Sequence, residues 1–310
     1  MSNNFRSITT AIPGTCGELV QGWSIDWDEP VLVSCPIAMY NRVTVNLRPG
    51  PEIFALGHEL DYPKSRQAAR LLLDTLGRPD LGATIHLSSQ LLPGRGMASS
   101  TADIVGVMMG LATALNYPLT PAELARLACQ IEPSDSTMFA GLAALAYRGT
   151  ARFLEFGPAP PLPLLMLDTG GAIDTLAYNA RLNLARVRQL APATQAALGL
   201  LRRGLADHDA AAIGAAATLS ALSYQTINHN PWLEQAQTWA KATAALGLVR
   251  AHSGSVIGLL YAADTDLDEL AAWLAARFEG TIWPTCLAPG GCQSLTCQPA
   301  PSLLEVSAAL

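Results

Sequence analysis

A glycine-rich turn lies between an expected strand and an expected helix in the first third of the chain. Residues 84–92 alternate in the manner of a half-buried strand, and residues 99–115 form an apolar stretch of helical length. Between them, Gly94 and Gly96 allow the backbone to turn without steric cost. This order predicts an anion-binding loop, because unpaired N–H groups and the helix dipole both favour negative charge at a helix start.

The small residues after the turn favour phosphate as the anion. Ser99, Ser100 and Thr101 would place hydroxyl groups and free N–H groups at the helix start. The alternative interpretation is a turn that only caps the helix. The chain has no Gly-Lys pair, no G-x-G-x-x-G and neither H-R-D nor D-F-G. The sequence therefore excludes a Walker A loop, that dinucleotide fingerprint and the protein-kinase signature.

Composition restricts the class of protein further. Half of the 310 residues are hydrophobic and 14% are charged, as in a folded chain large enough for two domains. The formal net charge is −6 and only two residues are lysine, which argues against nucleic acid and anionic membranes as partners. Residues 104–115 are too few to span a bilayer, and a cytoplasmic location is expected. The six cysteines form no C-x-x-C pair and are expected to be reduced structural or surface thiols; the alternative is that the last three, Cys286, Cys292 and Cys297, bind a metal.

The order of elements predicts an α+β protein. Strands are expected at residues 42–47, 84–92, 164–167 and 255–262, and helices at 67–76, 99–115, 120–130, across 175–246 and at 267–278. The segment 157–163 has four prolines and is interpreted as a linker. We therefore expect an N-terminal domain at 1–157, a C-terminal domain at 158–293, and a tail at 294–310 without periodicity that is expected to be disordered.

The loop from Pro93 to Ala102 resembles the ATP-binding motif of GHMP kinases, P-x-x-x-G-L-G-S-S-A-A. Met97 replaces the leucine of that pattern, a swap that conserves volume. Ala98 replaces a glycine, so its backbone is expected to avoid positive φ. Residues 13–22 (PGTCGELVQG) occupy the place of the family's first motif, and residues 251–258 (AHSGSVIG) resemble its third.

This resemblance implies a two-domain GHMP kinase fold with the ATP site in the cleft between the halves, and ATP and Mg²⁺ as cofactors. PGTCGELVQG, GMASSTAD, EPSDST and AHSGSV together are similar to the L-threonine kinases of cobalamin biosynthesis, over residues 13–291. Those enzymes make O-phospho-L-threonine, so L-threonine is the expected substrate. The residues implied in nucleotide binding are Leu92, Pro93, Gly94, Arg95, Gly96, Met97, Ala98, Ser99, Ser100, Thr101 and Ala102.

Two carboxylates follow the helix expected at residues 120–130. By resemblance Asp135 is the candidate base that accepts or orients the substrate proton, and Glu132 and Ser100 are the candidate Mg²⁺ ligands. The alternative is that residues 132–137 only cap and turn a helix, because Pro133 stops it. Asp135 would in a third interpretation only position the hydroxyl.

The first and third motifs supply candidates for the amino-acid end of the substrate. These are Glu18, as a partner for the ammonium group, with Gln21, Ser253 and Gly254. Cys16 is expected to pack or contact substrate without acting as a nucleophile, since the mechanism needs no covalent step. His252 is expected to be a structural hydrogen-bonding residue. No arginine can be assigned to the substrate carboxylate, although Arg66 is one option.

Three functions remain open at this stage. The first is a threonine kinase, and the second a GHMP kinase for homoserine or another small alcohol. The third is a non-catalytic GHMP-fold protein that binds a ligand. Ser100, Glu132 and Asp135 together argue against the third, and serine stays open as a substrate because it lacks only one methyl group.

Overall fold

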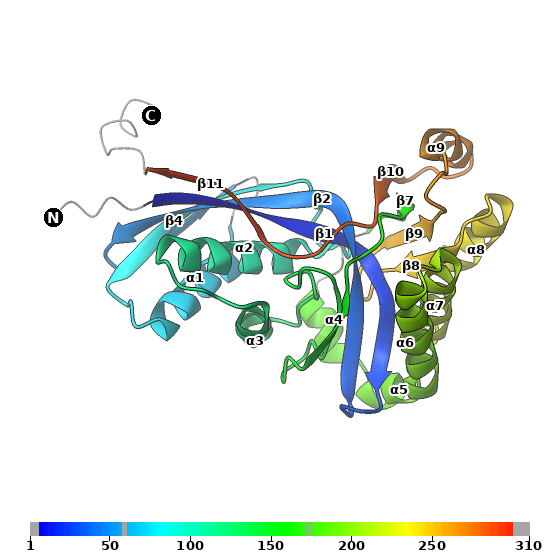
Figure 1. Cartoon of the computed structure of the whole chain (residues 1–310), viewed down its shortest axis with the longest axis horizontal. Coiled ribbons are helices and arrows are strands. Elements are labelled where there is room, and N and C mark those ends of the chain that lie inside the picture. Colours follow the sequence, from blue (N-terminus) through cyan, green and yellow to red (C-terminus); the bar gives the residue numbers. More distant parts are fainter. Residues whose placement is uncertain (1–5, 58–60, 172, 174, 300–310) are drawn as a thin grey trace.

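The computed structural model describes residues 6–57, 61–171, 173 and 175–299 (Figure 1). In this part of the chain eleven strands form one sheet, whose main path runs β10-β7-β9-β8-β1-β2-β4-β3. Helices lie against it in two groups, one for each half of the chain. None of the helices described is both long and apolar enough to cross a bilayer.

Two long antiparallel strands, β1 (Arg6–Ser24) and β2 (Glu29–Pro49), connect the two groups. Each runs along the first group of helices and then bends toward the second group, as the two blue ribbons in Figure 1 show. Their pairing shifts register between Pro13 and Val20. A strand that loses its regular pairing bends more easily. The first motif lies at this bend.

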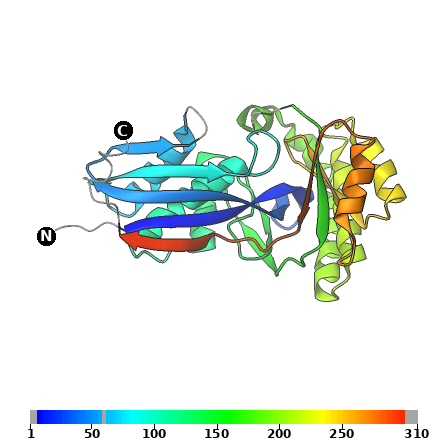
Figure 2. The same ribbon diagram turned by 90° about the horizontal axis from the view of Figure 1, so that it is seen from above.

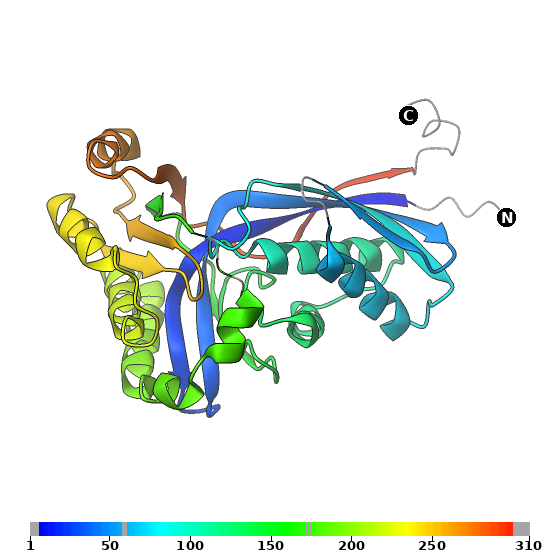
Figure 3. The same cartoon turned by 180° about the vertical axis from the view of Figure 1, so that it is seen from behind.

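The first group of helices covers one face of β1, β2, β3 (Ile53–Leu56) and β4 (Leu81–Ser89), as Figure 3 shows from behind. Its helices are α1 (Pro63–Thr75), α2 (Ser99–Ala114) and α3 (Pro121–Ile131). A Cβ atom at Gly106 would lie 2.6 Å from the Ile12 and Val43 side chains. This glycine therefore lets α2 lie close to the sheet.

The second group surrounds the other half of the sheet. Helix α7 packs on β1 and β8, and α6 packs on α7 (Figures 1 and 2). The strands here are β7 (Pro163–Asp168), β8 (Gly247–Arg250), β9 (Val256–Leu260) and β10 (Thr281–Cys286). The helices are α4 (Thr175–Arg181), α5 (Leu184–Arg188), α6 (Ala191–Ala206), α7 (Ala210–Tyr224), α8 (Leu233–Ala242) and α9 (Leu267–Ala275).

The remaining strands tie the chain together. β5 (Leu142–Leu145) pairs with β2 and with β6 (Phe153–Gly157). β11 (Gln293–Pro299) returns to the first half and pairs antiparallel with β1, the red and dark blue strands of Figure 2. The tail expected from residue 294 therefore begins as a strand, because β1 offers it a free edge. Residues 300–310 lie outside the described residues.

Most of the expected elements are present. The expected helix start at Thr120 is confirmed, because Thr120 and Glu123 form a reciprocal capping box. The strand predicted at 84–92 spans Leu81–Ser89 instead, so three predicted residues belong to the loop after it. The α+β class is confirmed. Residues 158–162 lie between β6 and β7, and the domain division placed there stays a prediction, since β1 and β2 serve both halves.

Candidate active site

The glycine-rich turn leads directly into the start of α2. Gly94 and Gly96 have φ values of 71° and 85°, which glycine adopts without strain. Ala98 precedes the helix with φ 57° and ψ 25°, in the left-handed region. The expectation that Ala98 avoids positive φ is therefore wrong: this tight entry into the helix requires it despite the cost to an L-residue. No side chain caps the start of α2, which leaves its N–H groups to a ligand.

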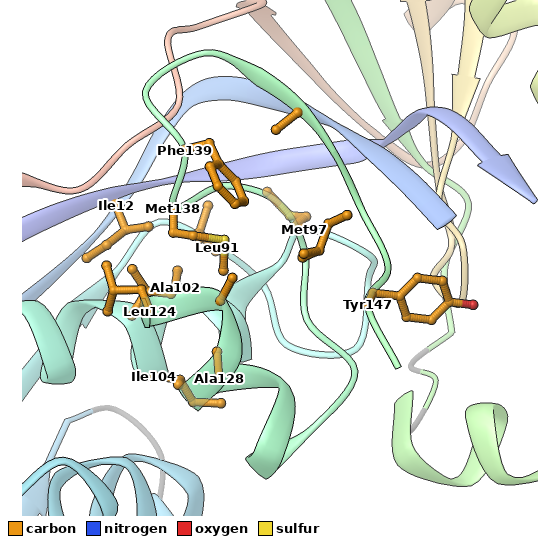
Figure 4. Close-up of a cluster of buried hydrophobic side chains, with 14 of the residues drawn as sticks. Ile12, Leu91, Met97, Ala102, Ile104, Leu124, Ala128, Met138, Phe139 and Tyr147 are labelled. Atoms are coloured by element: carbon orange, nitrogen blue, oxygen red, sulfur yellow. The ribbon is translucent and has the colours of Figure 1, made fainter. Parts of the chain in front are cut away.

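The apolar residues of the loop anchor it in the core. Figure 4 shows Leu91 and Met97 within the same apolar cluster as Ile12 and Phe139, while Tyr147 lies apart on the opposite side. Met97 is buried, with 1% of its surface exposed. The packing of Leu91 and Met97 in the core therefore holds the loop in place.

The three motifs of the sequence meet at this loop. Thr15 donates its backbone N–H to the Met97 carbonyl at 3.1 Å, and Gly17 donates to the Gly96 carbonyl at 3.2 Å. From the other side, the Ser255 N–H donates to the Arg95 carbonyl at 2.9 Å. The fit is close, because a Cβ atom at Gly17 would lie 2.2 Å from the backbone carbon of Arg250.

A cavity of about 650 Å³ opens over the loop and extends between the two halves of the chain. It is lined by nine of the eleven predicted nucleotide-binding residues, Arg95 and Ala102 being the exceptions. Glu18, Glu132, Asp135 and Ser253 also line it, whereas Gln21 and Gly254 do not. The cavity therefore joins the predicted phosphate site to most of the predicted substrate and metal residues.

Asp135 lies in this cavity beside the start of α2. Its carboxylate accepts a hydrogen bond from the Thr101 hydroxyl at 3.1 Å, and the backbone N–H of Asp135 donates to the Thr101 hydroxyl oxygen at 3.2 Å. Burial raises the pKa of Asp135 to about 6, the charge of Glu132 adds to this, and hydrogen bonds from Thr101 and Glu18 oppose it. A carboxylate that is ionised at neutral pH but still basic is suited to accept a proton.

Glu18 shares a hydrogen bond with Asp135. Burial, and then the neighbouring charge of Asp135, raise the pKa of Glu18 well above its usual value. Its Oε2 atom is buried and has no hydrogen-bond partner within the structure. Two buried carboxyl groups in contact resist ionising together, so each raises the cost of charging the other.

Glu132 forms an ion pair with Lys64, and both residues line the cavity. Its Oε2 atom lies 2.5 Å from the Lys64 ammonium on α1, and only 2% of the Glu132 side chain is exposed. Together with Ser100 it offers the oxygen ligands that Mg²⁺ prefers. Within the described residues no group of three or more histidine, cysteine or acidic side chains could hold a metal. Two protein oxygens fit an ion that is also held by phosphate and water.

His252, which lines the cavity, is hydrogen-bonded to Gln21, which lies outside it. His252 Nδ1 lies 3.0 Å from Gln21 Oε1, which can only accept, so Nδ1 carries the proton and Nε2 accepts from the Tyr147 hydroxyl at 3.2 Å. Burial, followed by the nearby charges of Arg250 and Arg148, lowers the pKa of His252 to about 3. His252 is therefore a hydrogen-bonding residue, and Gln21 supports it from outside the cavity.

Cys16 is fully buried and its thiol is unsuited to nucleophilic attack. Burial raises its pKa far above the usual value, with a further contribution from Glu18. A Cβ atom at Gly258 would lie 2.7 Å from the Cys16 sulfur, so the thiol fills space against the third motif. Packing is therefore its role.

Asp168 links the phosphate loop to the third motif. It accepts hydrogen bonds from the Ser255 hydroxyl at 2.8 Å and the Gly170 N–H at 3.0 Å, and it lies 3.4 Å from the Arg95 guanidinium. Arg95 thereby supports the loop from behind.

Sequence reasoning did not identify Lys64, Tyr147 or Asp168. For Lys64 a signal existed, because it is one of only two lysines and follows a proline at a helix start. Asp168 and Tyr147 end buried strand-like runs with nothing in their neighbourhood to distinguish them. Their roles come from partners far away in the sequence.

Comparison with known proteins gives the class. The GHMP kinase N-terminal domain matches residues 62–148. L-threonine kinase of Salmonella typhimurium is 31% identical over 276 residues, which cover 88% of this chain and 89% of that protein. The chain thus belongs to the GHMP kinase family, and its motifs meet around a kinase site.

Solved structures share the fold. The homoserine kinase from Cytophaga hutchinsonii is 16% identical, covers 95% of this chain and 99% of its own, and has a TM-score of 0.69. MDDEF, in complex with MVAPP, AMPPCP and magnesium, is 15% identical, covers 94% and 99%, and has a TM-score of 0.71. At these identities the likeness concerns the fold alone.

Proposed function

We propose that this protein transfers the γ-phosphoryl group of ATP to the side-chain hydroxyl of L-threonine, giving O-phospho-L-threonine and ADP. One observation carries the proposal: the Glu18–Asp135 pair lies in the same cavity as the uncapped start of α2. A group that can accept a proton and a site for phosphate are thereby held together. The likeness to L-threonine kinase over most of both chains supports threonine as the acceptor.

The phosphate loop and its neighbours bind the nucleotide. N–H groups at the start of α2 and the hydroxyls of Ser99 and Ser100 hold the triphosphate. Ser100 and Glu132 would hold Mg²⁺, which when bound neutralises charge on the phosphates. Thr15, Gly17 and Ser255 hold the loop in shape through its carbonyl groups. These contacts fix the phosphates before the acceptor arrives.

Asp135 receives the proton. As the threonine hydroxyl oxygen forms a bond to the γ-phosphorus, the bond to the bridging oxygen of ADP breaks and the hydroxyl proton passes to Asp135. Glu18 faces the substrate amino group. An arriving ammonium group favours ionisation of Glu18, so the buried pair adapts its charge to the substrate. Gln21 acts indirectly, through His252.

A substrate panel tests the proposal. ADP release is measured with ATP and Mg²⁺ in the presence of L-threonine, L-serine, L-homoserine or no acceptor, and the product is identified by mass spectrometry. Preference for L-threonine with phosphothreonine as product supports the proposal. Release with homoserine alone keeps the class but overturns the substrate, and ATP binding without any turnover favours the non-catalytic alternative.

The proposal also assigns a place in metabolism. Phosphothreonine would feed synthesis of the aminopropanol phosphate that joins the corrin ring of cobalamin to its nucleotide loop. A cytoplasmic site of action accords with the use of ATP and with the free thiols of Cys16, Cys35, Cys129, Cys286 and Cys292.

A further inference from the structure

The cavity carries an excess of negative charge. Five carboxyl groups line it, and among its described lining residues Lys64 is the only lysine or arginine. The carboxyl residues are Glu18, Asp61, Asp103, Glu132 and Asp135. An ATP triphosphate brings about four more negative charges into this space, where like charges repel strongly. Positive groups in the cavity are therefore essential for nucleotide binding.

Lys64 occupies an electrostatically unfavourable position in its own helix. It is the second residue of α1, where the helix dipole disfavours a cation, and the first turn contains no acidic residue. Its ion-pair partner, Glu132, comes from the end of α3. The local sequence of α1 thus gives no reason for a lysine here, whereas the cavity does.

Lys64 is able to change partners. A third of its side chain is exposed, whereas Glu132 is almost completely buried. A lysine ammonium is a compact charge on a flexible stem, which allows it to move without backbone rearrangement. Both residues line the cavity together with Ser99 and Ser100 at the start of α2.

We propose that Lys64 moves from Glu132 to the triphosphate when ATP binds, and so releases the Glu132 carboxylate to hold Mg²⁺ with Ser100. This inference rests on the proposed function for its nucleotide. Before ATP binds, Lys64 compensates the buried charge of Glu132. Afterwards, the phosphates and the metal take the places of the two partners, and no buried charge is left unpaired at either stage.

ATP affinity without metal tests this exchange. Titration calorimetry in EDTA measures the Kd for ATP in wild type, Lys64→Met, Lys64→Arg and Glu132→Gln. We expect Lys64→Met to raise Kd at least about tenfold, since a charge-assisted contact is lost, and Lys64→Arg to lie between it and wild type. Glu132→Gln is expected to lower Kd, because it frees Lys64 and removes a negative charge. Lys241→Met, at the exposed second lysine on α8, is the control and should match wild type.

Repeating the titrations with Mg²⁺ distinguishes the role of Glu132 from that of Lys64. Wild type should gain affinity from Mg²⁺, and Glu132→Gln should lose most of this gain. Equal metal-free Kd values in wild type, Lys64→Met and Glu132→Gln would overturn the proposal. The ion pair would then be purely structural, and its loss would only lower the melting temperature of the two variants. If Lys64→Met does not fold, a lower Kd in Glu132→Gln still supports the exchange, and an unchanged Kd refutes it.

The outcome is distinguishable from failure of the proposed function. Wild type that binds ATP but does not phosphorylate threonine would refute that function, while the titrations would still decide the role of Lys64. Wild type that binds no ATP in either condition would refute both.

Discussion

The carboxyl groups of Glu18 and Asp135 are hydrogen-bonded to each other in the wall of the active-site cavity, although they come from β1 and from the loop after α3. Two buried carboxyls in contact cannot both ionise easily, and burial raises the pKa of both. Asp135 keeps its charge near neutral pH and is left as the base. This pair therefore divides the substrate and proton-transfer roles between two similar residues.

Replacing Asp135 should abolish most of the activity without unfolding the protein. Asp135→Asn keeps the size and can still bond Thr101, but it cannot accept the substrate proton. We expect kcat to fall by about 100- to 10,000-fold, the usual contribution of a general base. ADP release with threonine measures this, and a melting curve checks the fold. Activity within a few-fold of wild type would restrict Asp135 to positioning the hydroxyl.

The rate should depend on pH through Asp135. Its pKa is raised to about 6, mainly by burial. The base is therefore protonated and inactive below this pH, and kcat/KM should fall about tenfold for each pH unit below roughly 5.5. A pH–rate profile from 4.5 to 8.5 measures the acid limb. A limb centred near the ordinary aspartate pKa would contradict the burial of this carboxyl.

Stability should depend on pH through the same pair, with the opposite sense to a carboxylate whose pKa is lowered on folding. Raised pKa values mean that the folded state binds more protons than the unfolded state between the ordinary and the raised values, so the free energy of unfolding falls as pH rises through this window. Glu18→Gln removes the Glu18 share. At pH 8 we expect the free energy of unfolding of this variant, measured by urea denaturation, to exceed that of wild type by at least about 1 kcal/mol. At pH 4 the two proteins should have nearly equal urea midpoints. Equal midpoints at both pH values would contradict the raised pKa.

Ala98→Gly should stabilise the protein. Ala98 adopts φ 57°, where a Cβ atom is unfavourable and glycine is not. We expect the free energy of unfolding to rise by about 1 kcal/mol, measured by urea denaturation. Ala112→Gly, inside α2 with ordinary helical backbone, is the matched control and should lower it by about 1 kcal/mol.

Gly17→Ala should disturb the close contact between the first motif and the backbone at Arg250 and Ala251. The added Cβ atom would lie 2.2 Å from the Arg250 backbone, so either β1 or the chain at Arg250 and Ala251 must shift. We expect a loss of about 3 kcal/mol of stability from strain and overpacking, and weaker ATP binding. Gly77 has a similar φ of 67° with nothing within 4 Å, so Gly77→Ala carries only the backbone strain. Equal effects of the two variants would show that the close approach at Gly17 is unimportant.

The sequence predicted the local parts of this protein because local rules govern them. Helix α3 begins directly after Thr120, because Thr120 is its N-cap, Pro121 suits the first helical position and Glu123 completes the capping box. The phosphate loop was visible as two glycines between a strand and a helix, and the order of the three motifs led to the family. Of the two long strands, only residues 42–47 of β2 were predicted. β1 was not predicted, since Pro13, Gly14 and Gly17 interrupt its strand pattern.

Only the tertiary structure decided which of these residues act together. Glu18 and Asp135, Lys64 and Glu132, and Gly17 and Arg250 come from distant segments, and their pairing depends on how β1 bends between the two halves. A carboxyl group titrates according to its burial and its neighbours, and neither is encoded at its own position. The sequence thus determined the class of protein through its loops, while the long-range contacts determined which carboxyl groups are buried together and how their pKa values shift.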